Sequence, residues 1–402
     1  MFAERLRERG LIAISIAMLA IARDSPDPPV TQQHVAVRIE PRSPVDLALS
    51  RALADDVWSE DPVVVVVAPA ALDQLRAHGV PLRVVVGDLD AERRRLAHRA
   101  TAGWFAEYRD NVELNAHLAA LAEAHPTLAS VRRVGSSIEG RPILAIEISH
   151  GGKLAVVLDG GHHAREWISV MVPTCIADRL ATGYTRDARI RRILDATKLV
   201  IIPVINPDGY HHTWTVDRYW RKNRRGGYGV DLNRNYSVGW GGAGSSDDPR
   251  SPNYRGERPF SEPETQAMRD VFARDEVVAH VDFHAFSQVV VYPWSHQRAD
   301  PPDRDELAAI ADRMSTAMTT ARDHRYIVRP GAQLQVGAGG TAGDWSYGTY
   351  GALSFLIELR PSSGAGGGFV LPPDQIVPTC DEAMAGVLEL GDWLVDHASS
   401  MN

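Results

Sequence analysis

The chain has 402 residues, of which 44% are hydrophobic, and its 51 acidic and 43 basic side chains give a formal net charge of −8. This length is sufficient for two domains, and the acidic balance argues against nucleic acid as a partner. After residue 22 no apolar stretch is long enough to form a membrane helix, so no stable membrane span is expected.

The N-terminus has the pattern of an export signal. Residues 1–22 begin with Arg5, Arg7 and Arg9, continue with an apolar run over 11–22, and end in a small-x-small triplet. This order is typical of a signal peptide, and the apolar run is too short to cross a bilayer comfortably. The alternative is an amphipathic or disordered tail. We therefore expect a secreted protein in which the proline-rich residues 23–33 form a linker.

A small domain is predicted over residues 34–92. Strands are expected at 34–39, 63–67 and 82–86, and helices at 44–58 and 69–78. Strands that alternate with two helices in a segment of this size favour an α+β open sandwich. The following residues, 93–102, form a basic run, which is most often a solvated helix face.

Residues 103–402 alternate strands with helices over a longer span. Strands are predicted at 143–148, 154–158, 199–205, 277–283, 288–292 and 353–359, and helices at 113–124, 168–180, 187–194, 263–272, 305–323 and 373–397. This alternation favours an α/β domain with a largely parallel sheet covered by helices on both faces. In such sheets ligands bind at the carboxyl ends of the strands.

Three connections in this domain have their own signals. Residues 261–264 (Ser-Glu-Pro-Glu) are predicted to start a helix with a capping box. Residues 206–209 (Asn-Pro-Asp-Gly) indicate a turn. Residues 224–258 form an irregular loop whose length is typical of a functional or disordered segment.

Candidate metal ligands follow two of the predicted strands. His163 and Glu166 come after 154–158, and His284 comes directly after 277–283. Imidazole and carboxylate groups are common zinc ligands, and a catalytic zinc site usually has three protein ligands and one open position. Glu358 lies inside the apolar run 353–359, where a carboxylate is costly without a partner, so we interpret it as functional.

Eight short motifs or single residues, in a fixed order along the chain, include these candidates. They are His-Ala-Arg-Glu-Trp (163–167), Asn-Pro-Asp-Gly-Tyr (206–210), Trp-Arg-Lys-Asn-Arg (220–224), Asp-Leu-Asn-Arg-Asn (231–235), Ser-Glu-Pro-Glu-Thr (261–265), His284, Asp344-Trp345 and Glu358-Leu-Arg. Each motif alone is weak evidence, but the ordered set resembles the zinc metallocarboxypeptidases of the carboxypeptidase A/B-like (M14, funnelin) family. The resemblance extends over roughly residues 104–397.

The resemblance has consequences for the domains. It implies a mixed eight-stranded sheet in the catalytic domain, 103–402. It also implies that residues 34–92 are a prosegment that folds separately and covers the active-site cleft. The family's activating cleavage then falls in 93–102, which makes this basic run a protease-sensitive link and a trypsin-like protease an expected partner.

The resemblance also implies a catalytic centre. One zinc ion per chain is held by His163, Glu166 and His284 and activates a water molecule. Glu358 is the general base that takes the proton of this water and passes it to the leaving amine. Arg221 stabilises the negative oxygen of the tetrahedral intermediate.

Substrate binding is assigned to further polar residues by the same resemblance. Asn233 and Arg234 bind the terminal carboxylate of a peptide, because an arginine fork matches a carboxylate in two parallel hydrogen bonds. Arg165 assists further along the cleft. The expected partners are therefore peptide or protein C-termini, and we expect a monomer.

The chain departs from the family pattern at two positions. Val336 stands where the family usually has a mobile tyrosine that closes over the terminal carboxylate, and this suggests weaker substrate binding. Phe286 replaces a common tyrosine, so its ring can line the cleft but cannot donate a hydrogen bond.

Specificity is predicted from Gly343 and Leu356. In the family an acid at the position of Gly343 goes with basic terminal residues, and this chain has none there. Leu356 points the same way as Glu358, because residues two apart on a strand share a face, and it adds an apolar wall. We therefore expect a preference for neutral, apolar or aromatic C-terminal residues.

Two other functions are compatible with these residues. One is the hydrolysis of another amide by a deacylase or a cell-wall peptidase of the same fold. The other is a carboxylate-binding module with little catalysis, to which Glu358 is the main objection because such a module has no need of a base.

Two cysteines, Cys175 and Cys380, are too few for a disulfide framework. They can pair if the protein is exported. The other interpretation, which is slightly favoured, is that they are two small buried core residues.

Overall fold

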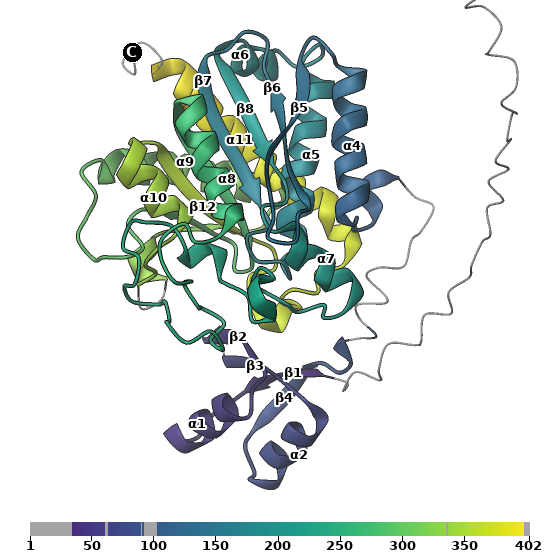
Figure 1. The fold of residues 1–402 in the computed structure, drawn as a ribbon, viewed down its shortest axis with the longest axis vertical. Coiled ribbons are helices and arrows are strands. Elements are labelled where there is room, and N and C mark those ends of the chain that lie inside the picture. Colours follow the sequence, from purple (N-terminus) through teal and green to yellow (C-terminus); the bar gives the residue numbers. More distant parts are fainter. Residues whose placement is uncertain (1–33, 61–62, 90, 92–102, 335–336, 398–402) are drawn as a thin grey trace, which may run out of the picture. The chain divides into compact units, whose positions relative to one another are not determined.

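The computed structural model describes residues 34–60, 63–89, 91, 103–334 and 337–397 (Figure 1). These residues all belong to one compact unit of the chain, 33–402. The predicted signal peptide, the linker 23–33, the basic run 93–102 and Val336 lie outside the described residues. The expectations about these segments therefore remain predictions.

An eight-stranded sheet is the centre of the larger part. Its strands, in spatial order, are β11 (Ile327–Pro330), β10 (Val289–Tyr292), β12 (Leu353–Leu359), β9 (Val277–Ala285), β7 (Leu154–Gly160), β8 (Thr197–Ile202), β6 (Pro142–Ile148) and β5 (Ala129–Ser136). The pairs β11–β10, β12–β9, β9–β7 and β7–β8 are parallel. The pairs β10–β12, β6–β8 and β5–β6 are antiparallel. The predicted mixed, largely parallel sheet is confirmed.

Helices cover both faces of this sheet (Figure 1). The larger core cluster includes residues of α4 (Asn111–Ala124), α5 (Trp167–Gly183), α6 (Ala188–Ala196), α9 (Arg304–Arg322) and α11 (Ile376–His397). The second cluster, on the opposite face, includes residues of α8 (Pro263–Asp275) and α10 (Ala342–Tyr350). None of the described helices is long and apolar enough to cross a membrane.

Strands β9 and β12 have one apolar face and one polar face. Within 279–285 of β9 and 353–359 of β12, the odd-numbered residues, including Phe283 and Ile357, are buried in the larger core cluster. Side chains alternate along a strand, so the even-numbered residues project to the opposite face. On β9 and β12 these are His280, Asp282, His284, Ser354, Leu356 and Glu358. The alternation therefore collects the polar groups of two adjacent strands on one side of the sheet.

The N-terminal part forms a separate antiparallel sheet. Its order is β2 (Asp56–Glu60), β3 (Val63–Val67), β1 (Val35–Ile39) and β4 (Leu82–Val86), with α1 (Pro44–Ala52) and α2 (Pro69–Ala77). The predicted α+β architecture is confirmed. The expected helix over 44–58 is wrong in its second half, because 56–60 pairs with β3 instead of continuing α1.

One predicted turn and one predicted start of a helix differ in the structure. Residues 206–209 are not an isolated turn: Asn206 caps α7 (Pro207–Thr215), and its side chain accepts a hydrogen bond from Gly209 N. The predicted capping box is wrong, because α8 begins after Glu262 without a side-chain cap. Glu264 instead accepts a hydrogen bond from Ile138 N, which ties α8 to a loop from a distant part of the chain.

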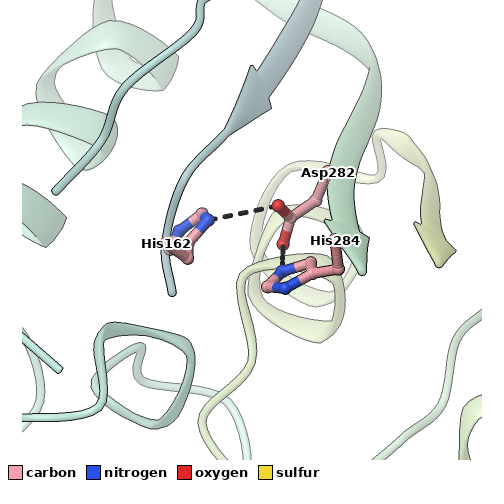
Figure 2. A group of neighbouring side chains, drawn as sticks. All are labelled: His162, Asp282 and His284. Atoms are coloured by element: carbon pink, nitrogen blue, oxygen red, sulfur yellow. Dashed lines mark hydrogen bonds and ion pairs between the residues drawn. The ribbon is translucent and has the colours of Figure 1, made fainter. Parts of the chain in front are cut away.

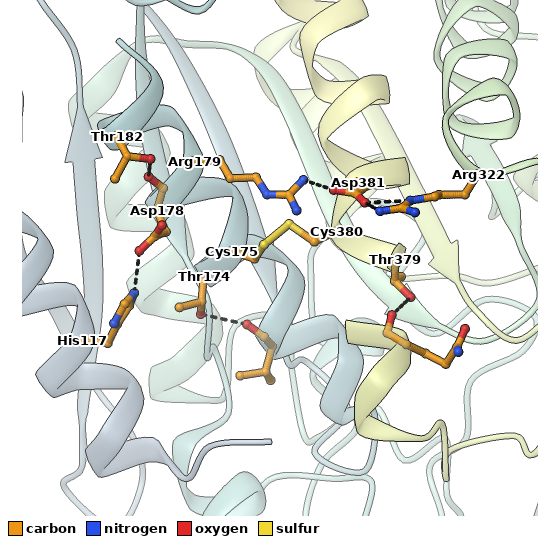
Figure 3. Close-up of a disulfide and its surroundings, with 12 residues drawn as sticks. His117, Thr174, Cys175, Asp178, Arg179, Thr182, Arg322, Thr379, Cys380 and Asp381 are labelled. Carbon is orange, nitrogen blue, oxygen red and sulfur yellow. Dashed lines mark hydrogen bonds and ion pairs between the residues drawn. A yellow bond between two sulfur atoms is a disulfide. The ribbon is translucent and has the colours of Figure 1, made fainter. Parts of the chain in front are cut away.

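Cys175 of α5 and Cys380 of α11 form a disulfide (Figure 3). Their Cα atoms are 6.2 Å apart although 205 residues separate them in sequence. Of the two interpretations left open by the sequence, the structure has the paired one, and the expected burial of both residues is confirmed. The pairing depends on α5 and α11 being adjacent in space, which spacing in the sequence does not reveal.

Candidate active site

His163, Glu166 and His284 bring three ligand atoms together. His163 Nδ1 lies 2.8 Å from Glu166 Oε1 and 3.1 Å from His284 Nδ1. His284 Nδ1 lies 3.0 Å from Glu166 Oε2. All three residues are buried, and two imidazole nitrogens with one carboxylate are a donor set that zinc prefers. The residues therefore fit one zinc ion.

The junction between β7 and α5 positions two of these ligands. Pro173 has no N–H, so the carbonyl of Ser169, four residues earlier in α5, lacks its usual helical donor. Gly160, the last residue of β7, lies so close to this carbonyl that a Cβ atom would collide with it. The strand end thus packs tightly against the helix, and the short connection between them holds His163 and places Glu166 at the N-cap of α5.

Asp231 contacts both the zinc-ligand candidate His163 and Arg221. Its Oδ1 lies 3.1 Å from His163 Nε2, and its Oδ2 accepts a hydrogen bond of 2.8 Å from Arg221 Nη2. A carboxylate on the second nitrogen of a histidine ligand fixes the tautomer and the orientation of the ring. Asp231 was not predicted as a site residue. The signal was present, since this acid opens the motif that contains Asn233 and Arg234.

The electrostatics of His163 and Glu166 suit metal binding, whereas His284 differs: burial acts to lower its pKa, but the charges of Asp282 and Glu166 hold the pKa well above its usual value, so metal must displace a proton there. Burial lowers the pKa of His163, and the positive charge of Arg221 lowers it further, so the ring favours its neutral form. Burial acts to raise the pKa of Glu166, but the charges of His163 and His284 lower it overall, so the carboxylate remains ionised. A neutral imidazole and an ionised carboxylate are the forms that bind a metal.

Glu358 lies beside the cluster. It is the register partner of His284 across the β9–β12 pair, and its buried Oε2 has no hydrogen-bond partner among the described residues. Burial, followed by the charge of Glu166, raises the pKa of Glu358 to about 8. A buried carboxylate oxygen without a partner is costly, and this cost is relieved if the site binds a water molecule and a cation.

The predicted carboxylate-binding residues are adjacent to the cluster. Asn233 Oδ1 accepts a hydrogen bond from Ala342 N, and its Nδ2 lies 3.0 Å from His284 Nε2. Arg234 donates to the carbonyls of Gly244 and Asn233. In the described part of the chain its guanidinium therefore contacts carbonyl oxygens, and its positive charge stays available for an anionic group.

Arg165 and Phe286 both lie against Phe369. The guanidinium carbon of Arg165 is 4.3 Å from the centroid of the Phe369 ring, and the ring of Phe286 is 4.9 Å from it. Phe286 and Phe369 also belong to an apolar cluster with Val64 of the N-terminal sheet. The structure thus brings the predicted pair together next to the smaller domain.

Gly343 and Leu356 lie near the same part of β12. Gly343 is in the first turn of α10, and a Cβ atom added to it would lie 3.3 Å from Ser354 Oγ. Ser354 and Leu356 are on the same face of β12 as Glu358. The wall predicted for the terminal side chain of a substrate therefore contains a glycine, a serine and a leucine, without a charged residue among these three.

The fold and this constellation define a zinc-dependent hydrolase, and comparison with known proteins identifies its family. The family model described as "Zinc carboxypeptidase" matches residues 114–386. Carboxypeptidase B of Astacus astacus is 36% identical over 306 residues, covering 73% of this chain and 99% of that protein. Carboxypeptidase A2 of Mus musculus is 33% identical over 339 residues, covering 80% and 81%.

Solved structures agree with these sequence matches. The crystal structure of thrombin activatable fibrinolysis inhibitor has a TM-score of 0.83 at 29% identity, covering 90% of this chain and 99% of that one. Carboxypeptidase A of Helicoverpa armigera has a TM-score of 0.80 at 27% identity, covering 92% and 99%. The chain belongs to the zinc carboxypeptidase family, whose members are peptide hydrolases that act as exopeptidases.

Proposed function

We propose that this chain is a secreted proenzyme of a zinc carboxypeptidase that removes neutral apolar or aromatic residues from peptide C-termini. The observation that carries the proposal is the convergence of His163, Glu166 and His284 beside the unpartnered Oε2 of Glu358. The membership in the zinc carboxypeptidase family supports this reading over a deacylase, a cell-wall peptidase or a binding module.

The chemistry follows from the positions of these groups. His163, Glu166 and His284 would hold the zinc ion, which would supply a Lewis acid that lowers the pKa of water and polarises the scissile carbonyl group. Glu358 accepts a proton from the attacking water and transfers it to the leaving amine. Arg221, which Asp231 holds by a 2.8 Å hydrogen bond, donates to the carbonyl oxygen as negative charge develops on it.

Selectivity for the chain end follows from Arg234. Its guanidinium is partly buried and donates to backbone carbonyl groups in the described part of the chain. A terminal carboxylate satisfies this charge, whereas an internal peptide or a C-terminal amide leaves it unpaired. Asn233 and Arg165 complete this binding region, and the uncharged wall of Gly343 and Leu356 favours neutral side chains.

Secretion and activation by cleavage of the prosegment are also part of the proposal, and each rests on its own observation. The pattern of residues 1–22 and the disulfide Cys175–Cys380 both suit an oxidising compartment. The apolar cluster that joins Val64 to Phe286 and Phe369 supports a prosegment that covers the site. Cleavage within 93–102 would release this segment.

Metal content of purified variants tests the ligand set. After removal of loosely bound metal, the wild-type protein is expected to retain one zinc ion per chain by elemental analysis. His163→Ala, Glu166→Gln and His284→Ala are expected to lose it, because three ligands are needed for a tight site. His117→Ala, a change to a half-buried histidine on α4, is the matched control. Zinc retained by all three site variants would refute the assignment.

Limited digestion with trypsin tests the proenzyme. We expect a stable fragment that begins near residue 100, together with an increase in peptidase activity as it appears. Digestion that leaves no such fragment, or a fragment no more active than the intact chain, would contradict the proposal.

A further inference from the structure

Asp282 connects the zinc-ligand cluster to a second buried histidine (Figure 2). Its Oδ2 lies 2.9 Å from His284 Nε2, and its Oδ1 lies 3.1 Å from His162 Nδ1. His162 Nε2 in turn lies 2.7 Å from the hydroxyl of Tyr236. His162, Asp282 and Tyr236 are completely buried. None of the three was predicted as a site residue.

The position of Asp282 follows from the strand pattern. His280, Asp282 and His284 alternate along β9 and project from the same face. A buried carboxylate is retained at a large desolvation cost unless its oxygens are hydrogen-bonded. Here each oxygen meets one histidine nitrogen, so the carboxylate is satisfied from two sides.

A second metal site at His162, Asp282 and His284 is the competing interpretation, since their ligand atoms also lie close together. The ring of His284 argues against it. Its Nδ1 faces His163 and Glu166, so a ring that binds zinc through Nδ1 carries its proton on Nε2. That N–H is the donor to Asp282 Oδ2 at 2.9 Å and leaves Nε2 no lone pair for a second metal ion. Asn233 Nδ2, 3.0 Å from the same nitrogen, then contacts it without a hydrogen bond.

We propose that Asp282, held in place by His162, is a positioning residue that orients His284 toward the zinc ion. This inference rests on the ligand set proposed above. Asp282 would do for His284 what Asp231 does for His163, so that each histidine ligand has its own buried carboxylate. Loss of such a partner typically weakens metal affinity by about 10- to 100-fold.

Zinc affinity measured by competition with a chromophoric chelator tests this role. Asp282→Asn is expected to raise the zinc dissociation constant by about 10- to 100-fold. The matched control is Asp208→Asn. Asp208 is also a buried carboxylate, but its Oδ1 accepts a 2.6 Å hydrogen bond from Ser137 Oγ and its Oδ2 a 2.7 Å hydrogen bond from Glu139 N, so both oxygens pair outside the contact between Asp282 and His162. The control should change the constant by less than about threefold, because it leaves the carboxylate on His284 intact.

A spectrum gives a second readout. In the cobalt(II)-substituted protein, Asp282→Asn should shift the visible absorption bands of the metal, and Asp208→Asn should leave them in place. Equal effects of the two substitutions on affinity and spectrum would show that Asp282 is only a structural residue and would overturn the proposal. So would a zinc affinity of Asp282→Asn within threefold of wild type.

Two further variants keep the result interpretable. If Asp282→Asn does not fold, as judged by circular dichroism of the metal-free protein, His162→Gln tests the same contact from its other side. It should raise the zinc dissociation constant by at least about threefold, and an unchanged constant would overturn the proposal.

His163→Ala distinguishes a wrong ligand set from a wrong positioning role. If it binds zinc as tightly as wild type, the ligand set is wrong. If it loses zinc while Asp282→Asn behaves like Asp208→Asn, the ligand set stands and the positioning role is wrong.

Discussion

Glu358 on β12 and His284 on β9 are register partners on adjacent parallel strands. Side chains of register partners project from the same face of a sheet, so the candidate base and a candidate zinc ligand are fixed next to each other by backbone hydrogen bonds. This arrangement needs no mobile loop to bring the two groups together. It explains why the carboxylate lies in an otherwise apolar strand.

Removal of the base should abolish most of the activity. Glu358→Gln keeps the size of the side chain but cannot accept a proton from water, so kcat should fall by about 10²- to 10⁴-fold. Zinc content should not change, because Glu358 is not among the ligands. Steady-state kinetics and elemental analysis of the same preparation check both points. Activity within a few-fold of wild type would refute the role of Glu358.

The pH dependence of the activity should also report on Glu358 as the general base. A general base works only when deprotonated, so activity should fall as the pH falls through its pKa. In the metal-free protein burial and Glu166 raise the pKa of Glu358 to about 8. A zinc ion beside the carboxylate lowers this pKa, so the acidic limb of kcat/KM should lie below pH 8. The residual activity of Glu358→Gln should lack this limb, and an unchanged limb would assign it to another group.

Arg234 should decide whether the enzyme recognises a chain end. Arg234→Met removes hydrogen bonds to a charged group worth about 1.5–3 kcal/mol, which corresponds to a loss of about 10- to 150-fold in kcat/KM on free-acid peptides. Most of the loss should appear as a higher KM. Arg250→Met is the control, because this arginine is largely exposed and pairs with Asp248. An equal effect of both substitutions would argue against a specific carboxylate site.

Gly343 offers a direct test of the specificity prediction. Gly343→Asp places a carboxylate next to Ser354 at the wall of the predicted pocket, where a Cβ atom has its nearest contact at 3.3 Å. We expect the ratio of kcat/KM for C-terminal Arg over C-terminal Phe to rise by at least about tenfold, the value of one buried charge pair of 1.4 kcal/mol. Gly343→Asn controls for size without charge. A wild-type enzyme that already prefers Arg or Lys would contradict the prediction.

The disulfide should contribute to stability. It closes a loop of 205 residues between Cys175 and Cys380, and removal of a native disulfide typically lowers the free energy of unfolding by about 2–5 kcal/mol. Cys175→Ala combined with Cys380→Ala should therefore lower the midpoint of thermal unfolding, as reductant should for the wild type. Thiol titration of the denatured, unreduced protein should detect no free thiol. Two reactive thiols would contradict the pairing.

The sequence was most informative where local order reflects function. The histidines and Glu358 could be assigned from their places at or in apolar runs, and the ordered motifs pointed to the correct family. Contacts between distant segments could not be assigned. The support of His163 by Asp231 joins residues 68 positions apart in sequence. The support of His284 by Asp282 is local to β9, where alternation places both side chains on one face; the sequence carried this signal and it was missed.

Other errors have local physical reasons. The edge strands β5 and β11 were not predicted, because both are partly exposed and carry arginines in place of a clear apolar pattern. The helix predicted over 44–58 was too long, since residues 56–60 have a β-strand partner in β3 that only the folded chain supplies. In each case tertiary pairing overrode the local signal.

The products formed from a panel of peptides are the most direct test of the proposed carboxypeptidase activity. The trypsin-processed, zinc-loaded protein would be incubated with peptides that differ in the last residue, each as a free acid and as a C-terminal amide, and the products identified by mass spectrometry. The account predicts removal of single terminal residues from the free acids only, fastest for Phe and Leu. Cleavage within the peptides, equal cleavage of the amides, or no cleavage despite bound zinc would contradict it.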